Sequence, residues 1–173
     1  MHPLAWPINR ALIPHCAASL TVTLAVLLVA SPASATTTPV QLTVRNLDFT
    51  SASCSDPTNP FLCHATATGD LNNNLSATQG TVQYDLVIDW SPGFDAPCNV
   101  VDETAIFALA AGTLTTTSHH RDCPATVRPG PRIDTTFTIA GGTGAFAGAS
   151  GGGTERSAHA DQAPVIYDGQ MRF

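Results

Sequence analysis

Apolar and polar residues alternate along several stretches of this 173-residue chain, and this pattern constrains its fold most. Successive side chains of an extended strand point to opposite faces, so strict alternation predicts a strand with one buried face. The clearest example is "TVQYDLVIDW", residues 81–90. One face of this strand would carry the apolar residues, and we expect them to line the interior of the fold: Tyr84, Leu86, Ile88 and Trp90, together with Val82.

Three further stretches show the same alternation of apolar and polar residues: "VQLTVRNLDF" at 40–49, "RIDTTFTIA" at 132–140 and "VIYDGQMRF" at 165–173. In the first, the apolar positions change face after Val44, which predicts a β-bulge near Arg45 and Asn46. The stretch "ETAIFALAAGTLTTT" at 103–117 is apolar on both faces at its start. Its threonines and β-branched residues favour one strand buried on both sides over a short helix.

The connections between these stretches are rich in Pro, Asn, Asp and Gly, as in "SCSDPTNPFLC" and "CPATVRPGPR". Such residues favour turns, and short strands at fairly regular spacing are typical of an antiparallel barrel or sandwich. We therefore predict an all-β fold, a small antiparallel β-barrel with a β-sandwich as the alternative. No internal repeat and no sign of a second domain is found in the sequence.

The N-terminus has the three-part pattern of a secretory signal peptide. Arg10 precedes the apolar run at 17–30, and "SPASA" follows with small residues at Ala33 and Ala35. The run is too short to span a bilayer comfortably. We expect residues 1–35 to be cleaved after Ala35, which leaves one secreted, extracellular domain at 36–173.

Charge argues against two classes of partner. Without residues 1–35 the chain would hold six arginines, thirteen acidic residues and no lysine. Nucleic acids and anionic membranes are bound through clustered Lys and Arg. We therefore expect neither nucleic-acid binding nor stable membrane insertion. The sequence does not indicate an oligomeric state.

Four cysteines would remain in the mature chain, and an even number in an exported protein predicts disulfides. Each of the pairs Cys54–Cys63 and Cys98–Cys123 flanks a loop between expected strands, and we predict these two bonds. A zinc site would require a C-x-x-C pair or close Cys/His spacing, which the sequence lacks. No metal is predicted.

The segment "GGTGAFAGASGGG" at 141–153 holds seven of the thirteen glycines. A phosphate-binding loop would need a helix after it, yet "GGTERSAHADQ" has no helical period and no Lys. We predict a structural turn in which Gly141 and Gly142 adopt positive φ, Gly148 and Gly151 allow close approach of the backbone or a bend in the next strand, and a single aromatic ring fills the end of the core. The residues assigned to this turn are Gly141, Gly142, Gly144, Phe146, Gly148 and Gly151.

The part "GGTGAFAGASG" at 141–151 resembles the turn-and-strand element Gly-Gly-(Ser/Thr)-Gly-x-Phe-x-Gly-Ala-x-Gly of the allene oxide cyclase and dirigent proteins. The resemblance covers about a fifth of the mature chain. It implies a small calycin-like barrel whose interior can hold an apolar guest. Allene oxide cyclases close a ring in such a cavity without a cofactor, and dirigent proteins steer radical coupling. No functional residue of either family can be placed here by motif.

Candidate catalytic groups are few. Asp85 and Asp89 would lie about 13 Å apart on one strand face, from a rise of roughly 3.3 Å per residue, too far for a glycosidase pair. His120 and Asp122 share a face and could form a metal or acid–base pair, although the segment "SHHRDC" fits an exposed polar turn better. There is no G-x-S-x-G nucleophile elbow. We assign no catalytic residue and expect no cofactor.

These observations favour a secreted barrel that binds a small apolar ligand or a surface partner without catalysis. A cofactor-free cyclase or isomerase is the alternative, and an outer-membrane barrel is the third option, since the chain ends in a terminal Phe. A buried polar group in the cavity near Tyr84 or Trp90 would favour the enzyme, whereas a filled interior would favour a binder or a structural domain. Neither the ligand nor the existence of a cavity follows from the sequence.

Overall fold

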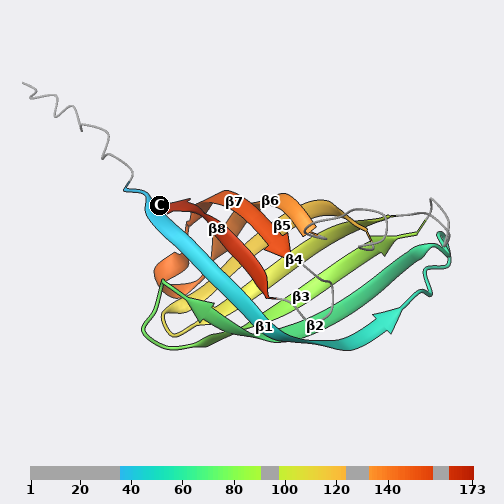
Figure 1. The fold of residues 1–173 in the computed structure, drawn as a ribbon, viewed down its shortest axis with the longest axis horizontal. Coiled ribbons are helices and arrows are strands. Elements are labelled where there is room, and N and C mark those ends of the chain that lie inside the picture. The colour runs from blue at the N-terminus through green and yellow to red at the C-terminus, as the bar shows by residue number, and fades with distance from the viewer. Residues whose placement is uncertain (1–35, 91–97, 124–132, 158–163) are drawn as a thin grey trace, which may run out of the picture. The chain divides into compact units, whose positions relative to one another are not determined.

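The computed structural model describes residues 36–90, 98–123, 133–157 and 164–173. Eight strands form a closed antiparallel barrel in which each strand pairs with the next and β8 returns to β1 (Figure 1). The all-β barrel predicted from the alternation is confirmed, and the β-sandwich is not formed. The strands are β1 (Thr38–Ser53), β2 (Leu62–Asn73), β3 (Gly80–Asp89), β4 (Asn99–Leu109), β5 (Gly112–Asp122), β6 (Ile133–Gly142), β7 (Ser150–Ser157) and β8 (Val165–Arg172).

The phase change in β1 produces the bulge expected from the sequence. The register with β2 shifts between Arg45 and Asp48, and Asn46 has a φ of 51°. Asn tolerates this left-handed conformation better than most residues. Its side-chain amide also donates to Asp70 Oδ2 at 2.8 Å. The bulge thus turns Leu47 and Phe49 toward the pocket described below.

The stretch 103–117 is not one strand, as we expected, but a hairpin. β4 ends at Leu109 and β5 begins at Gly112, and these two residues are paired across the turn. Gly112 has a φ of 142°, and a Cβ there would lie 2.1 Å from the Thr143 carbonyl oxygen. Ala110 and Ala111 lie between the two strands and resemble the strand residues before them, so the turn carries no strong sequence signature.

Inward-pointing side chains fill the middle of the barrel. Tyr167 is fully buried and packs edge-on against Phe107 and Phe137, with ring centroids 5.1 and 5.4 Å away. Edge-to-face packing of this kind adds about 0.5–1.5 kcal/mol beyond the area buried. The barrel centre is therefore a packed core and not an open channel.

The glycine-rich segment lies at the end of the barrel that carries the C-terminus, at the left of Figure 1. A short 3₁₀ helix, η1 (Gly144–Phe146), places the Phe146 ring in the core, where it is 5 % exposed. Positive φ angles occur at Gly141, Gly144, Gly148 and Gly151. Gly142 does not have one, although we had expected it. Its constraint is close approach, because a Cβ there would lie 2.3 Å from the Thr113 carbonyl oxygen.

The opposite end of the barrel carries both disulfides. Cys54–Cys63 joins the end of β1 to the start of β2, with an S–S distance of 2.00 Å. Cys98–Cys123 joins the start of β4 to the end of β5, with an S–S distance of 2.05 Å. Both pairs are those predicted from the sequence. We call the two ends the glycine end and the disulfide end.

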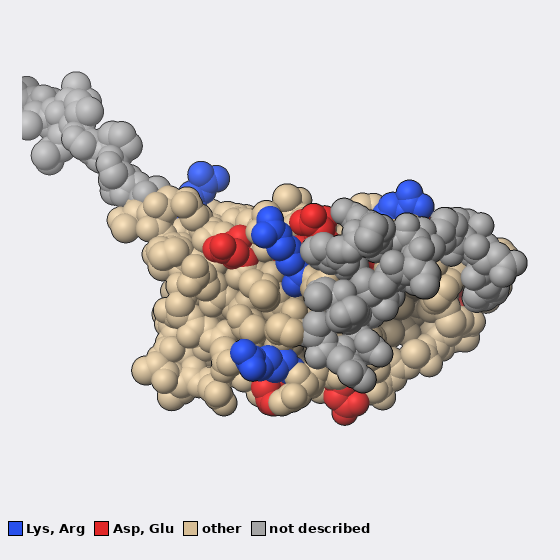
Figure 2. All heavy atoms as spheres, viewed as in Figure 1, with Lys and Arg blue, Asp and Glu red and all other residues tan. Residues whose placement is uncertain are grey.

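The outer face of the first half of β3 is polar, although Ile106 and Ile166 are exposed on other strands. The outward positions of β3 are Thr81, Gln83 and Asp85, all exposed. On the face shown in Figure 2, acidic and basic side chains lie interspersed on a mostly uncharged surface. Within the described residues, we find no helix of the length and apolar character needed to cross a membrane.

Candidate functional site

A cavity of about 90 Å³ lies inside the disulfide end of the barrel. Most of the described side chains that line it are apolar. They are Leu47, Phe49, Ala67, Leu86, Ile88, Val101 and Val165. The polar lining consists of Tyr84, Glu103, His120, Asp122 and Ser157. An apolar wall with a few convergent polar groups is the usual composition of a small-molecule site.

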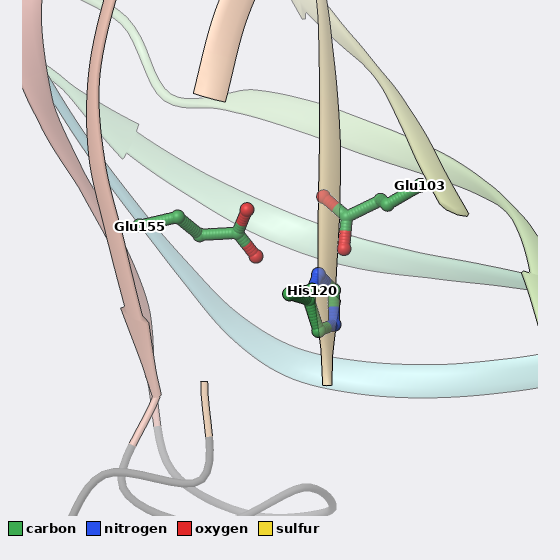
Figure 3. A group of neighbouring side chains, drawn as sticks. All are labelled: Glu103, His120 and Glu155. Carbon is green, nitrogen blue, oxygen red and sulfur yellow. The ribbon is translucent and has the colours of Figure 1, made fainter. Parts of the chain in front are cut away.

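Three titratable side chains meet beside this cavity: Glu103 from β4, His120 from β5 and Glu155 from β7 (Figure 3). One potential ligand atom from each lies within 4.8 Å of the others. All three side chains are buried, with exposures of 6, 7 and 0 %. We call these three residues the acidic cluster.

One carboxylate of the cluster is held by a hydrogen bond. The Tyr167 hydroxyl donates to Glu103 Oε1 at 2.7 Å and lies 3.2 Å from the Tyr84 hydroxyl. Tyr84 and Tyr167 are the only tyrosines of the chain, and both are buried. The three groups form a polar chain that runs from the apolar core to the cavity wall.

Glu155 is less well satisfied. It is fully buried, and neither of its carboxylate oxygens has a hydrogen-bond partner among the described residues. A buried carboxylate without partners is costly. Such groups in a native fold are explained by a protonated state, a bound ion or a functional role.

Burial governs the protonation of the cluster. It raises the pKa of Glu103 to about 8, and the nearby Glu155 charge adds to the effect while the Tyr167 hydroxyl opposes it. Burial likewise raises the pKa of Glu155 to about 7, partly offset by the approach of the Ser118 and Tyr167 hydroxyls. It lowers the pKa of His120, with Asp122 acting in the opposite direction. Near neutral pH the cluster therefore favours an uncharged Glu103 carboxyl and a neutral imidazole, while Glu155 lies close to the midpoint of its titration.

The residues proposed from the sequence as cavity lining divide into two groups. Tyr84, Leu86 and Ile88 line the cavity. Trp90 follows the end of β3, where its backbone N–H donates to the Phe61 carbonyl oxygen at 2.9 Å, and it is not among the lining residues. Asp85 lies exposed on the outer face.

His120 and Asp122 do not lie in an exposed polar turn, which was the interpretation that we favoured. Both are part of β5, and both line the cavity. The neighbouring His119 points outward, as alternation requires, and its Nδ1 lies 2.6 Å from Asp102 Oδ1 in an exposed pair. The segment is a continuous strand whose two histidines lie on different sides of the barrel wall.

Sequence reasoning missed Glu103 and Glu155 because acidic residues are usually assigned to the exposed face. A signal for Glu103 was present, since it shares its phase with Val101, Ala105 and Phe107 on the inward face of β4. For Glu155 the signal was weak. Its strand, β7, is built from Ser, Gly, Thr and charged residues, so no apolar phase marks the inward face.

The fold and the site define a small, disulfide-bonded β-barrel protein with a buried acidic cluster beside an internal cavity. No family model matches the sequence, and no curated protein sequence matches it. A solved structure titled pyocyanin demethylase is similar, with a TM-score of 0.43 and 14 % identity, over 78 % of this chain and 99 % of that chain. A likeness this distant carries no information about function.

Proposed function

We propose that this protein binds a small, mainly apolar molecule in the cavity at the disulfide end. The observation that carries the proposal is the cavity itself, which interrupts an otherwise packed barrel. Its apolar wall would bury the body of the guest, and Glu103 and His120 would contact a polar group on it. Apolar cavities of about 150 Å³ accept a benzene-sized guest, so this one, at about 90 Å³, would hold a smaller guest or the end of a chain.

Two other observations support the proposal. The closed eight-stranded barrel agrees with the architecture implied by the resemblance of residues 141–151 to the allene oxide cyclase and dirigent proteins. The disulfides are consistent with an extracellular protein. Secretion remains a prediction, because residues 1–35 lie outside the described residues. Mass determination of the exported protein tests it, and Thr36 is the expected first residue.

The test uses 1-butanol, a short apolar chain with one hydroxyl group, and follows its binding through the methyl resonances of the protein. We expect saturable binding to the wild-type protein and at least tenfold weaker binding to Val101→Phe, which fills the cavity. The matched control is Ile106→Phe on the same strand, since Ile106 is 40 % exposed on the outer face. Circular dichroism establishes that both variants fold. Equal binding by the two folded variants would contradict the proposal.

Catalysis by a cofactor-free isomerase is the second candidate. The observation that favours it is the buried carboxyl of Glu103 at the cavity wall, hydrogen-bonded to Tyr167. In its ionised form, which the raised pKa makes the minority form near neutral pH, this carboxyl could take a proton from one carbon of the guest and return it to another. In D₂O this exchange would place deuterium on a bound apolar enone, and nuclear magnetic resonance would detect it. Deuterium uptake that persists in Glu103→Gln would exclude this role for Glu103.

The outer-membrane barrel has less support than either candidate. Barrels of that class carry an apolar band on the outside and a polar interior. Here Val82 and Tyr84 of β3 point inward, while Thr81, Gln83 and Asp85 face out. This alternation is the reverse of the one expected in lipid.

A further inference from the structure

We infer that Glu103, His120 and Glu155 form a binding site for a divalent first-row transition-metal ion, represented here by Zn²⁺. The inference does not depend on the proposed apolar ligand, because it rests on the placement of the three side chains relative to one another, although Glu103 and His120 also line the cavity. It rests on their mutual geometry and on the unsatisfied oxygens of Glu155.

The three donor atoms are already close to the spacing that a metal requires. Zn²⁺ binds imidazole nitrogen and carboxylate oxygen at about 2.0–2.2 Å, and tetrahedral ligands are then about 3.4 Å apart. The cluster atoms lie within 4.8 Å of one another without an ion. Small side-chain rotations would close the remaining gap. Each donor comes from a different strand of the barrel wall, so the scaffold for the site is rigid.

The unsatisfied state of Glu155 points to a cation. This carboxylate is fully buried, and neither oxygen has a hydrogen-bond partner among the described residues. The chain has no lysine, and within the described residues the arginine ion pair is Arg156 with Asp134, on exposed side chains. Among the residues that the structure describes, no arginine forms an ion pair with Glu103 or Glu155. A metal ion would supply the missing charge and the missing bonds.

A metal fits the site better than an organic cation. Glu103 and His120 line the cavity, but Glu155 does not, so a guest in the cavity would not reach its oxygens directly. A single ion between the three side chains would reach all of them. The imidazole favours zinc-like ions over Ca²⁺ and Mg²⁺, which take oxygen ligands and higher coordination numbers.

The surrounding groups are those that orient metal ligands in other proteins. The Tyr167 hydroxyl holds Glu103 Oε1, and the Ser118 hydroxyl lies 3.4 Å from His120 Nδ1. Such second contacts fix the direction of the ligating atoms. With three protein ligands, a fourth position would remain open toward the cavity.

The experiment is isothermal titration of untagged, EDTA-treated protein with ZnCl₂, repeated with Co²⁺ to observe the visible absorption of a tetrahedral ion. We expect one ion per chain. His120→Ala and Glu155→Gln should each weaken binding by more than about 100-fold. His119→Gln, an exposed histidine on the same strand, is the control and should stay within threefold of wild type.

Absence of binding to the wild-type protein would overturn the inference, as would equal loss in His119→Gln. Glu155→Gln preserves the shape of the side chain, and circular dichroism establishes that each variant is folded. Retained stoichiometric binding in both folded cluster variants would also overturn it. Binding of 1-butanol, measured on the same EDTA-treated sample, distinguishes failure of the metal site from failure of the proposed function. Binding of 1-butanol without zinc binding would leave the proposed function standing and remove the metal site alone.

Discussion

The two ends of the barrel are built in different ways. At the glycine end, Phe146 is buried, and the connection from Leu109 to Gly112 is as short as a hairpin allows. At the disulfide end, the cavity and the acidic cluster replace a packed interior. Covalent bonds between neighbouring strands hold that end together. The comparison indicates that packing stabilises one end, which leaves the other free to keep polar groups and empty space.

The loops at the two ends of the barrel are also stabilised in different ways. The segment between β1 and β2 at the disulfide end is organised by its own side chains, since Asp56 Oδ1 accepts hydrogen bonds from the backbone N–H groups of Thr58 and Asn59. At the glycine end, η1 is tied to the β4–β5 turn by the bond from the Ala145 N–H to the Ala111 carbonyl oxygen, 2.8 Å long. The disulfide end thus relies less on contacts with the core.

The largest expected effect is on the packed end. Phe146→Ala removes a buried ring from the core and should lower the free energy of unfolding by about 3–5 kcal/mol. The matched variant Phe49→Ala removes a ring that is 51 % exposed at the cavity, and should cost less than about 1 kcal/mol. Urea denaturation measures both. Equal losses would show that the two ends do not differ in packing.

The disulfides should contribute next. Cys98→Ser/Cys123→Ser opens a loop with a sequence separation of 25, and the chain-entropy model predicts a loss of roughly 3–4 kcal/mol. Cys54→Ser/Cys63→Ser opens a separation of 9 and should cost about 2.5 kcal/mol. Urea denaturation of the two double variants shows which disulfide contributes more to the free energy of unfolding. The reverse order would mean that native contacts, and not loop length, set the contribution of each bond.

The acidic cluster should make the metal-free protein pH-dependent. Burial raises the pKa of Glu103 to about 8 and that of Glu155 to about 7, from an ordinary value of 4.5. The folded state therefore binds more protons than the unfolded state between these values, and stability falls as pH rises. We expect a loss of at least about 2 kcal/mol between pH 5 and pH 8 in EDTA.

Two variants sharpen this pH prediction. Glu155→Gln removes one of the coupled charges and should flatten the pH profile. Asp85→Asn changes an exposed carboxyl on the outer face and should leave the slope unchanged. Stability that rises from pH 5 to pH 8 would contradict the assignment of both carboxyls to the buried interior.

The smallest effect concerns a single backbone conformation at the glycine end. Gly148 has a φ of 79°, and a Cβ there would meet no atom within 4 Å. Gly148→Ala should therefore cost about 1 kcal/mol from conformation alone. Gly148→Asn should cost less, because Asn tolerates the left-handed region. Thermal unfolding measures the stability of both variants. A larger loss of stability in Gly148→Asn than in Gly148→Ala would indicate side-chain crowding instead.

The fold could be predicted wherever one face of a strand is apolar. In β3, Val82 and Tyr84 are buried while Gln83 and Asp85 are exposed, as period-two alternation requires. The bulge at Asn46 followed from the change of phase. The hairpin between β4 and β5 could not be found, because Ala110 and Ala111 resemble the strand residues around them in polarity.

The site was harder to predict because its charged residues occupy inward-facing strand positions, which are usually apolar. Glu103 occupies an inward position that pattern reading gives to an apolar residue, and its partner Glu155 lies 52 positions later on β7. Their proximity depends on the closure of the barrel, which no local pattern encodes. His120 was singled out from the sequence, but its burial depends on the strand that contains it.

The central claim is that guests bind at the disulfide end and not at the glycine end. Methyl resonances of Leu86, Ile88 and Val101, which line the cavity, and of Leu71, Leu114 and Ile139 in the packed core would be followed during titration with 1-butanol. We predict saturable shifts in the first set and shifts close to zero in the second. Equal shifts in both sets, or none in the first, would contradict the account.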